Sequence, residues 1–187
     1  MRTAALLLAA ACFSPLPSAA APQQLIAEAQ FVADILHAMG EPPIGQLPTG
    51  DQVFRFLWLR SFHRPFLVQV ERRGEDRALL LKALDSPWSA SPDGIHVGAL
   101  TVTQRKAVTR EVWERLAAMR RDTFWGRASY DPSAERGVDG AMWILEGRSW
   151  GDYHIVERWN PREGAFREMC LAMLEAAGVD LSAERIY

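Results

Sequence analysis

Apolar residues recur along the chain at two spacings, which predict helices and strands respectively. Steps of three and four predict helices over residues 23–39, 110–121 and 161–177. Runs rich in aromatic and β-branched residues predict strands, which we place at residues 54–62, 65–72, 77–84, 95–102, 141–146 and 153–159. Helices in N-terminal, middle and C-terminal positions, with hairpin-spaced strands between them, predict a single α+β domain with an antiparallel sheet of about five to six strands.

Local signals at the helix ends support two of these helices. Thr109 is a suitable N-cap for the middle helix. For the last helix, Asn160 as N-cap, Pro161 in the first position and Glu163 in the third form a capping signature, with Gly178 beyond the end. We therefore expect the last helix to begin directly after Asn160.

The first twenty residues have the order of an export signal. Arg2 supplies a positive charge, residues 4–11 are apolar, and small residues precede a cleavage point after Ala20. This order predicts a signal peptide over residues 1–20 and a periplasmic or secreted domain over residues 21–187.

Cysteines and apolar runs indicate whether the chain is attached to a membrane or spans one. Cys12 follows three alanines, which partly resembles a lipobox, so a lipid anchor at Cys12 is the alternative to cleavage after Ala20. Elsewhere no apolar run approaches the ~20 residues of a membrane span, and we expect none. Without Cys12 the mature chain has only Cys170, so we expect no internal disulfide and interpret Cys170 as a small core residue.

Charge and motif content argue against several functional classes. The chain of 187 residues has a net charge of −2, whereas nucleic-acid binding requires a basic surface. The four histidines have no metal-ligand spacing, and no glycine-rich phosphate loop is present. We therefore predict no nucleic-acid partner, no metal and no cofactor.

Residues 147–151 read Gly-Arg-Ser-Trp-Gly, which matches the G-x-S-x-G nucleophile elbow of serine hydrolases. An elbow requires a helix directly after the serine, whereas residues 152–159 (DYHIVERW) are typical of a strand. Asp152 and His154 lie too close along an extended strand to relay a proton to Ser149. We interpret the motif as a hairpin turn and predict that Ser149 is not a nucleophile.

Polar residues interrupt the apolar strands, and these are Arg60, His63, Glu146, His154 and Arg158. His154 and Arg158 should share one face of the last strand, opposite Tyr153, and Glu146 should reach one of the two faces. Acid–base chemistry by Glu146, His154 and His63 is one interpretation. A structural network of ion pairs and hydrogen bonds is the other, and it requires no activity.

Aromatic residues in or beside the predicted loops suggest a binding surface, since tryptophan, tyrosine and arginine are favoured in interfaces. These aromatic residues are Trp88, Trp125, Tyr130 and Trp150. The alternative is that their rings fold back onto the core, as large aromatic side chains usually do.

The stretch 139–161 contains D-G-x-x-W-x-x-E-G followed by Y-H-x-x-x-R-W-x-P. It resembles a group of exported bacterial proteins of unknown function, and residues 59–65 and 124–125 are similar to that group as well. The resemblance implies an α+β domain and carries no activity with it.

From these observations we expect an exported binding module, of the kind that includes inhibitors and immunity proteins. Its partner would be a protein or another envelope ligand, and its contact residues would be Arg60, His63, Glu146, Trp150, His154 and Arg158. The alternative function is a small cell-envelope enzyme that uses Glu146, His154 and His63 in acid–base catalysis.

Overall fold

The computed structural model describes residues 30–44, 50–91, 93–131, 137 and 139–186. The predicted signal peptide, Cys12 and the start of the first predicted helix lie outside these residues. Within them the chain forms one α+β domain, as the sequence predicts. The elements in chain order are a helix over residues 30–38, β1 (Gln52–Arg60), β2 (His63–Arg73), β3 (Asp76–Leu84), β4 (Ser89–Ser91), β5 (Gly94–His96), β6 (Leu100–Ala107), α2 (Arg110–Thr123), β7 (Ala141–Ser149), β8 (Asp152–Trp159) and α3 (Ala165–Ala177).

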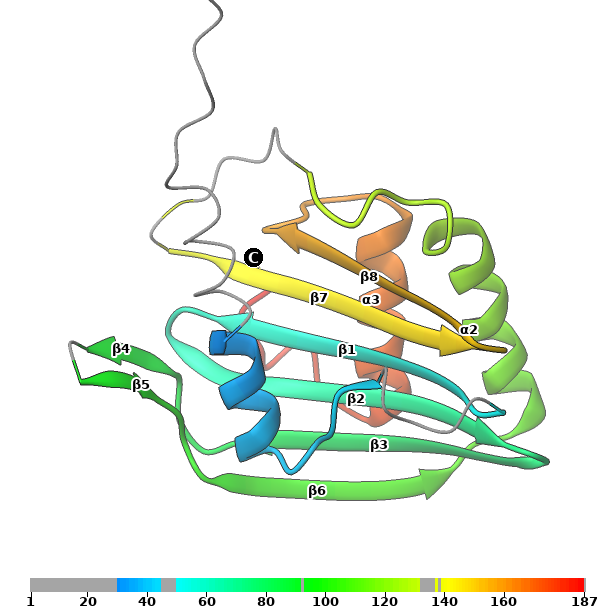
Figure 1. The fold of residues 1–187 in the computed structure, drawn as a ribbon, viewed down its shortest axis with the longest axis horizontal. Coiled ribbons are helices and arrows are strands. Elements are labelled where there is room, and N and C mark those ends of the chain that lie inside the picture. Colours follow the sequence, from blue (N-terminus) through cyan, green and yellow to red (C-terminus); the bar gives the residue numbers. More distant parts are fainter. Residues whose placement is uncertain (1–29, 45–49, 92, 132–136, 138, 187) are drawn as a thin grey trace, which may run out of the picture.

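The main sheet has six strands in the order β6-β3-β2-β1-β7-β8, and every neighbouring pair is antiparallel. β1 lies near the middle because it pairs with β2 through a tight turn and with β7 across a long connection. β4 and β5 form a separate small hairpin at one end of the molecule (Figure 1).

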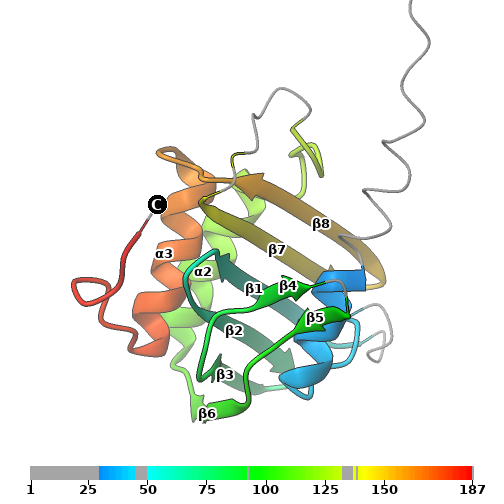
Figure 2. The ribbon, with the colours of Figure 1, turned by 90° about the vertical axis from the view of Figure 1, so that its left-hand side faces the viewer.

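Helices cover both faces of the sheet, so its central strands are buried on both sides. Figure 2 shows α2 and α3 on one side, and the helix at residues 30–38 with the β4–β5 hairpin on the other. The α2/α3 side holds the larger core, in which Phe56 and Trp143 pack with ring centroids 5.2 Å apart. Burial on both sides explains why β1 reads as a nearly continuous apolar run, FRFLWL, instead of an alternating one.

Two predicted boundaries were wrong. The strand expected over 95–102 is two strands, β5 and β6, because Asp85 accepts the Ala99 N–H (3.0 Å) and the chain there passes from the small hairpin to the main sheet. The capping signature of the last helix fails as well, since α3 begins at Ala165 after Gly164. Asn160 instead extends the β7–β8 pairing: its Oδ1 accepts the Ala141 N–H, and its own N–H donates to the Ala141 carbonyl (2.9 Å).

Other local predictions are confirmed. The Thr109 side chain accepts the Val112 N–H as the N-cap of α2, and Gly178 ends α3 in the left-handed region. Cys170 is fully buried in the larger core, and burial raises the pKa of its thiol. In the part of the chain that the structure describes, no helix is both long and apolar enough to cross a membrane.

Candidate functional site

The G-x-S-x-G sequence forms the turn of a hairpin, as predicted. β7 ends at Ser149 and β8 begins at Asp152, so the turn consists of Trp150 and Gly151, both with positive φ (53° and 98°). Positive φ at both central residues is the type I′ pattern that suits the twist of paired strands. The motif is followed by a strand and lacks the helix of a nucleophile elbow.

Packing explains the first glycine of the motif. A Cβ at Gly147 would lie 2.4 Å from the ring of Phe54 and 2.9 Å from that of Phe124, so only a residue without a side chain fits between these rings and the sheet. Ser149 accepts a hydrogen bond from the Gln52 amide at 3.2 Å. Gly147 and Ser149 therefore have structural roles, in packing and in hydrogen bonding.

Glu146 lies on the face of the sheet that is covered by the N-terminal helix, and it forms a buried pair with Arg55. Nε of Arg55 donates to Oε1 of Glu146 at 2.6 Å, and its Nη2 contacts the same oxygen. Arg55 is 1% exposed and Glu146 8% exposed. The register of β1 and β7 explains the contact, because it places Arg55 and Glu146 directly opposite each other.

The end of the N-terminal helix is joined to this pair through Glu41. Gly40 and Glu41 donate their N–H groups to the carbonyls of His37 and Leu36, a Schellman arrangement that ends the helix. The Glu41 carboxylate lies 2.5 Å from Nζ of Lys82 and 3.6 Å from Nη1 of Arg55.

Both cations of this cluster also donate to backbone carbonyls. Lys82 donates to the carbonyl of Met39 at 2.7 Å, and Arg55 donates to that of Pro42 at 2.9 Å. Two carboxylates and two cations therefore hold the end of the helix against the sheet, and each cation has acceptors on the protein itself.

Tyr153 on β8 completes the cluster at its outer side. Its hydroxyl donates to Oε2 of Glu146 at 3.2 Å, while its side chain remains 49% exposed. Burial of the hydroxyl and the negative charge of Glu146 raise the pKa of Tyr153 to about 12. The phenol is therefore protonated at neutral pH and acts as a hydrogen-bond donor.

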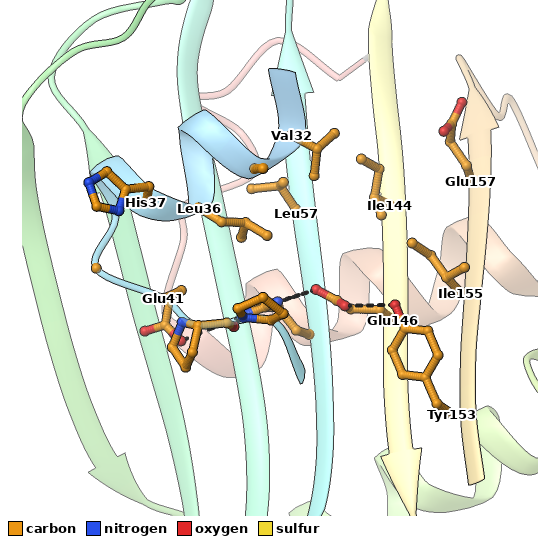
Figure 3. A pocket seen from close by; sticks show the side chains of 15 residues that line it. Val32, Leu36, His37, Glu41, Leu57, Ile144, Glu146, Tyr153, Ile155 and Glu157 are labelled. Atoms are coloured by element: carbon orange, nitrogen blue, oxygen red, sulfur yellow. Dashed lines mark hydrogen bonds and ion pairs between the residues drawn. The ribbon is translucent and has the colours of Figure 1, made fainter. Parts of the chain in front are cut away.

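A cavity of about 900 Å³ lies beside this cluster, between the N-terminal helix and strands β1, β7 and β8 (Figure 3). Its walls are mainly apolar, with Val32 and Leu36 on the helix and Leu57, Ile144 and Ile155 on the strands. Arg55, Glu146 and Tyr153 close one end, and Glu157 lies toward the other end. The volume falls within the ~300–1,000 Å³ typical of ligand pockets.

His154 and Arg158 lie on the opposite face of the sheet, as their spacing predicts. His154 donates from Nε2 to the Arg127 carbonyl at 2.8 Å and packs edge-on against Phe124, with ring centroids 4.9 Å apart. Arg158 donates to the carbonyls of Ala128 (2.7 Å) and Ser129 (3.3 Å). These two residues hold the segment after α2 against β8.

Arg60 and His63 lie at the far end of β1 and β2, next to the C-terminal segment. Arg60 is fully buried, pairs with Glu184 at 2.7 Å and stacks 4.1 Å from the centre of a Trp58 ring. Burial and the positive charge of Arg60 lower the pKa of His63. The structure therefore does not bring Glu146, His154 and His63 together as one site.

The loop aromatic residues divide into two groups. Trp88 packs on Phe31 with ring centroids 4.4 Å apart, and Trp125 packs against Phe54 at 6.0 Å. Tyr130 and Trp150 remain 44% and 75% exposed. Two of the four rings thus fold back onto the core, and Trp150 is the more exposed of the other two.

Glu146 is among the residues predicted from the sequence, whereas the other charged members of the cluster, Arg55, Lys82 and Glu41, are not. Arg55 and Lys82 each interrupt an apolar strand, in FRFLWL and RALLLKAL, which is the same signal that identified Arg60. Glu41 follows Gly40 at the end of a helix, and no local pattern indicates that a helix end will lie over two buried cations.

Comparison with known proteins identifies no family for the chain. No protein-family model matches the chain, and no curated protein matches its sequence. Among the described residues no group of three or more histidine, cysteine, aspartate or glutamate side chains is placed to hold a metal ion.

Proposed function

We propose that the protein is a binding module whose ligand occupies the cavity between the N-terminal helix and strands β1, β7 and β8. The observation that carries the proposal is the cavity itself, which is open to solvent and has about 900 Å³ lined by mainly apolar walls, with a buried polar cluster at one end. Apolar walls give affinity through the burial of apolar ligand surface, and a few fixed polar groups give orientation.

Binding is favoured over catalysis by the state of the polar groups. Glu146 is paired with Arg55 and accepts from Tyr153, so both carboxylate oxygens are fixed in position by partners on the protein. The pKa of Tyr153, raised to about 12, leaves the phenol unable to act as a base at neutral pH. The arrangement is suited to holding a ligand in one orientation.

The proposed location is the periplasm or the cell exterior. It is supported by the positive charge of Arg2, the apolar run over residues 4–11 and the small residues that precede the predicted cleavage point after Ala20. A ligand with a substantial apolar part is abundant in the cell envelope, which is consistent with this location.

A neutral fluorescent probe, N-phenyl-1-naphthylamine, tests the proposal. We expect saturable binding to the full chain, weakened at least about tenfold by Ala33→Trp, which places an indole at the cavity margin. Ala118→Trp is the matched control, because Ala118 is exposed on α2 on the opposite side of the sheet. Circular dichroism checks folding, and Ile155→Trp blocks the cavity from β8 if Ala33→Trp does not fold.

Absence of saturable probe binding to the wild-type protein would refute the proposal. Equal affinities of the wild type and both folded blocking variants would refute it as well, since the probe would then bind elsewhere.

A second candidate function, contact with a protein partner, is favoured by Trp150. Its side chain is 75% exposed at the tip of the β7–β8 hairpin, although tryptophan is usually buried in folded proteins. A pull-down from envelope extract tests this, with Trp150→Ala compared with Tyr130→Ala. A partner retained by Tyr130→Ala and lost by Trp150→Ala supports the contact, and equal retention by both variants contradicts it.

A further inference from the structure

The polar end of the cavity offers hydrogen-bond acceptors to a ligand, while its cations are already engaged. Arg55 donates through Nε to Glu146, contacts the same oxygen with Nη2 in an ion pair, and donates through Nη1 to the Pro42 carbonyl. Lys82 donates to Glu41 and to the Met39 carbonyl. A carboxylate or sulfate entering the cavity would therefore have to displace interactions that hold the N-terminal helix in place.

The acceptors, in contrast, have capacity to spare. An ionised carboxylate offers about four lone-pair positions, and the structure gives Oε2 of Glu146 one donor, the Tyr153 hydroxyl. Glu41, Glu146 and Glu157 all line the cavity, whereas Arg55 is its lining cation and Lys82 lies behind Glu41. Arg55 and Lys82 balance Glu146 and Glu41, so Glu157 gives the lining its net negative formal charge.

An aromatic ring stands next to Glu146 at the polar end of the cavity. Tyr153 lines the cavity, its hydroxyl is held by Glu146, and its side chain is 49% exposed. The face of a tyrosine ring attracts ammonium groups, and a nearby carboxylate adds a direct charge attraction. Both groups lie at the end of an apolar wall formed by Ile144 and Ile155 (Figure 3).

We infer that the ligand is an ammonium-bearing amphiphile, with its cationic group beside Glu146 and Tyr153 and its apolar chain between the N-terminal helix and strands β7 and β8. This inference rests on the proposed binding function and adds the chemical class of the ligand. The Tyr153 ring, the adjacent Glu146 carboxylate and the net negative charge of the whole lining select a cation, and the apolar walls select a chain.

Three detergents with the same alkyl chain and different headgroups test the inference. Dodecyltrimethylammonium, dodecyl maltoside and dodecyl sulfate compete with N-phenyl-1-naphthylamine, each below the concentration at which it forms micelles. We expect the cation to compete at least about tenfold better than the sulfate, with the neutral maltoside between them. Added salt should reduce the difference, since the charges at the cavity margin are partly screened.

Variants identify the groups responsible. Tyr153→Leu should weaken binding of the cation several-fold and leave the maltoside unaffected, while Tyr153→Phe, which keeps the ring, should retain the preference. Glu146→Gln and Glu157→Gln should each reduce the preference for the cation. Glu114→Gln is the matched control, because Glu114 is an exposed carboxylate on α2.

The outcomes separate this inference from the proposed function. If the probe does not bind, or folded blocking variants bind it normally, the proposed function fails. If the cavity binds the probe but the three headgroups compete equally, or the sulfate competes best, the ligand class is wrong and the binding function stands. If Glu146→Gln does not fold, Glu157→Gln and Tyr153→Leu decide: an unchanged preference in both overturns the inference.

Discussion

Removing Arg55 should destabilise the protein strongly, because its removal leaves a buried charge behind. Arg55 is 1% exposed, and its guanidinium donates to Glu146 at 2.6 Å and to the Pro42 carbonyl at 2.9 Å. In Arg55→Met the Glu146 carboxylate stays in an 8% exposed position without its cation. Breaking one side of a buried ion pair typically costs about 3–5 kcal/mol of unfolding free energy, and we expect a loss in that range.

Replacing both members of the pair should cost much less. In the double variant Arg55→Met/Glu146→Leu no uncompensated charge remains between β1 and β7, Glu41 keeps Lys82 at 2.5 Å, and the Tyr153 hydroxyl can bond to water. Apolar residues of similar volume often replace a buried pair without loss, so we expect the double variant within about 2 kcal/mol of the wild type. Each single variant should therefore be less stable than the double.

Urea unfolding followed by tryptophan fluorescence measures the four proteins of this cycle, provided that the slope with urea stays constant. The exposed pair Arg110 and Glu114 on α2, joined at 2.6 Å, is the matched control. Its cycle should show little coupling, because exposed pairs are weak. Additive effects of the Arg55 and Glu146 substitutions, within about 0.5 kcal/mol, would refute the reasoning.

Three further predictions concern single positions. The pKa of Tyr153 is raised from 10.0 to about 12, so the stability that its hydroxyl contributes is present below pH 10 and is lost as the pH rises toward 12. The free energy of unfolding should therefore decline over this pH range in the wild type and not in Tyr153→Phe. Gly147→Ala should cost about 1–3 kcal/mol because its Cβ would collide with Phe54, and an unchanged melting temperature would contradict this. His154→Ala should cost about 1–3 kcal/mol without changing probe binding. Weaker binding at unaltered stability would instead place His154 in the ligand site.

The fold was predictable because its elements follow local periodicity. The continuous apolar run in β1 and the acceptor side chain of Thr109 both depend on nearby residues, and both are confirmed. The start of α3 was not predictable in this way. Asn160 has the local pattern of an N-cap, but Ala141 at the start of β7 offers its backbone and side chain a stronger set of hydrogen bonds.

The candidate site was only partly predictable, because long-range register decides it. Alternation placed His154 and Tyr153 on opposite faces of β8, but it could not say which face Glu146 shares. That depends on the pairing of Glu146 with Ile155 and Arg55 across neighbouring strands. The cavity depends in addition on where the N-terminal helix lies, and its own sequence specifies only an apolar face.

Arg158 and the segment that it holds have a further consequence, for the behaviour of many copies of the protein together. β8 and β6 are the two edge strands of the sheet, and an open edge can add a strand from another molecule. At β8 the Ser129 carbonyl accepts the Glu157 N–H at 2.8 Å, and Arg158 holds residues 128–129 in that position. β6 is mostly exposed and carries Arg105 and Lys106, charges of the kind that discourage strand addition. The two edges thus differ, since a fixed segment of chain covers one and charged side chains line the other, and both features oppose the addition of a strand from another molecule.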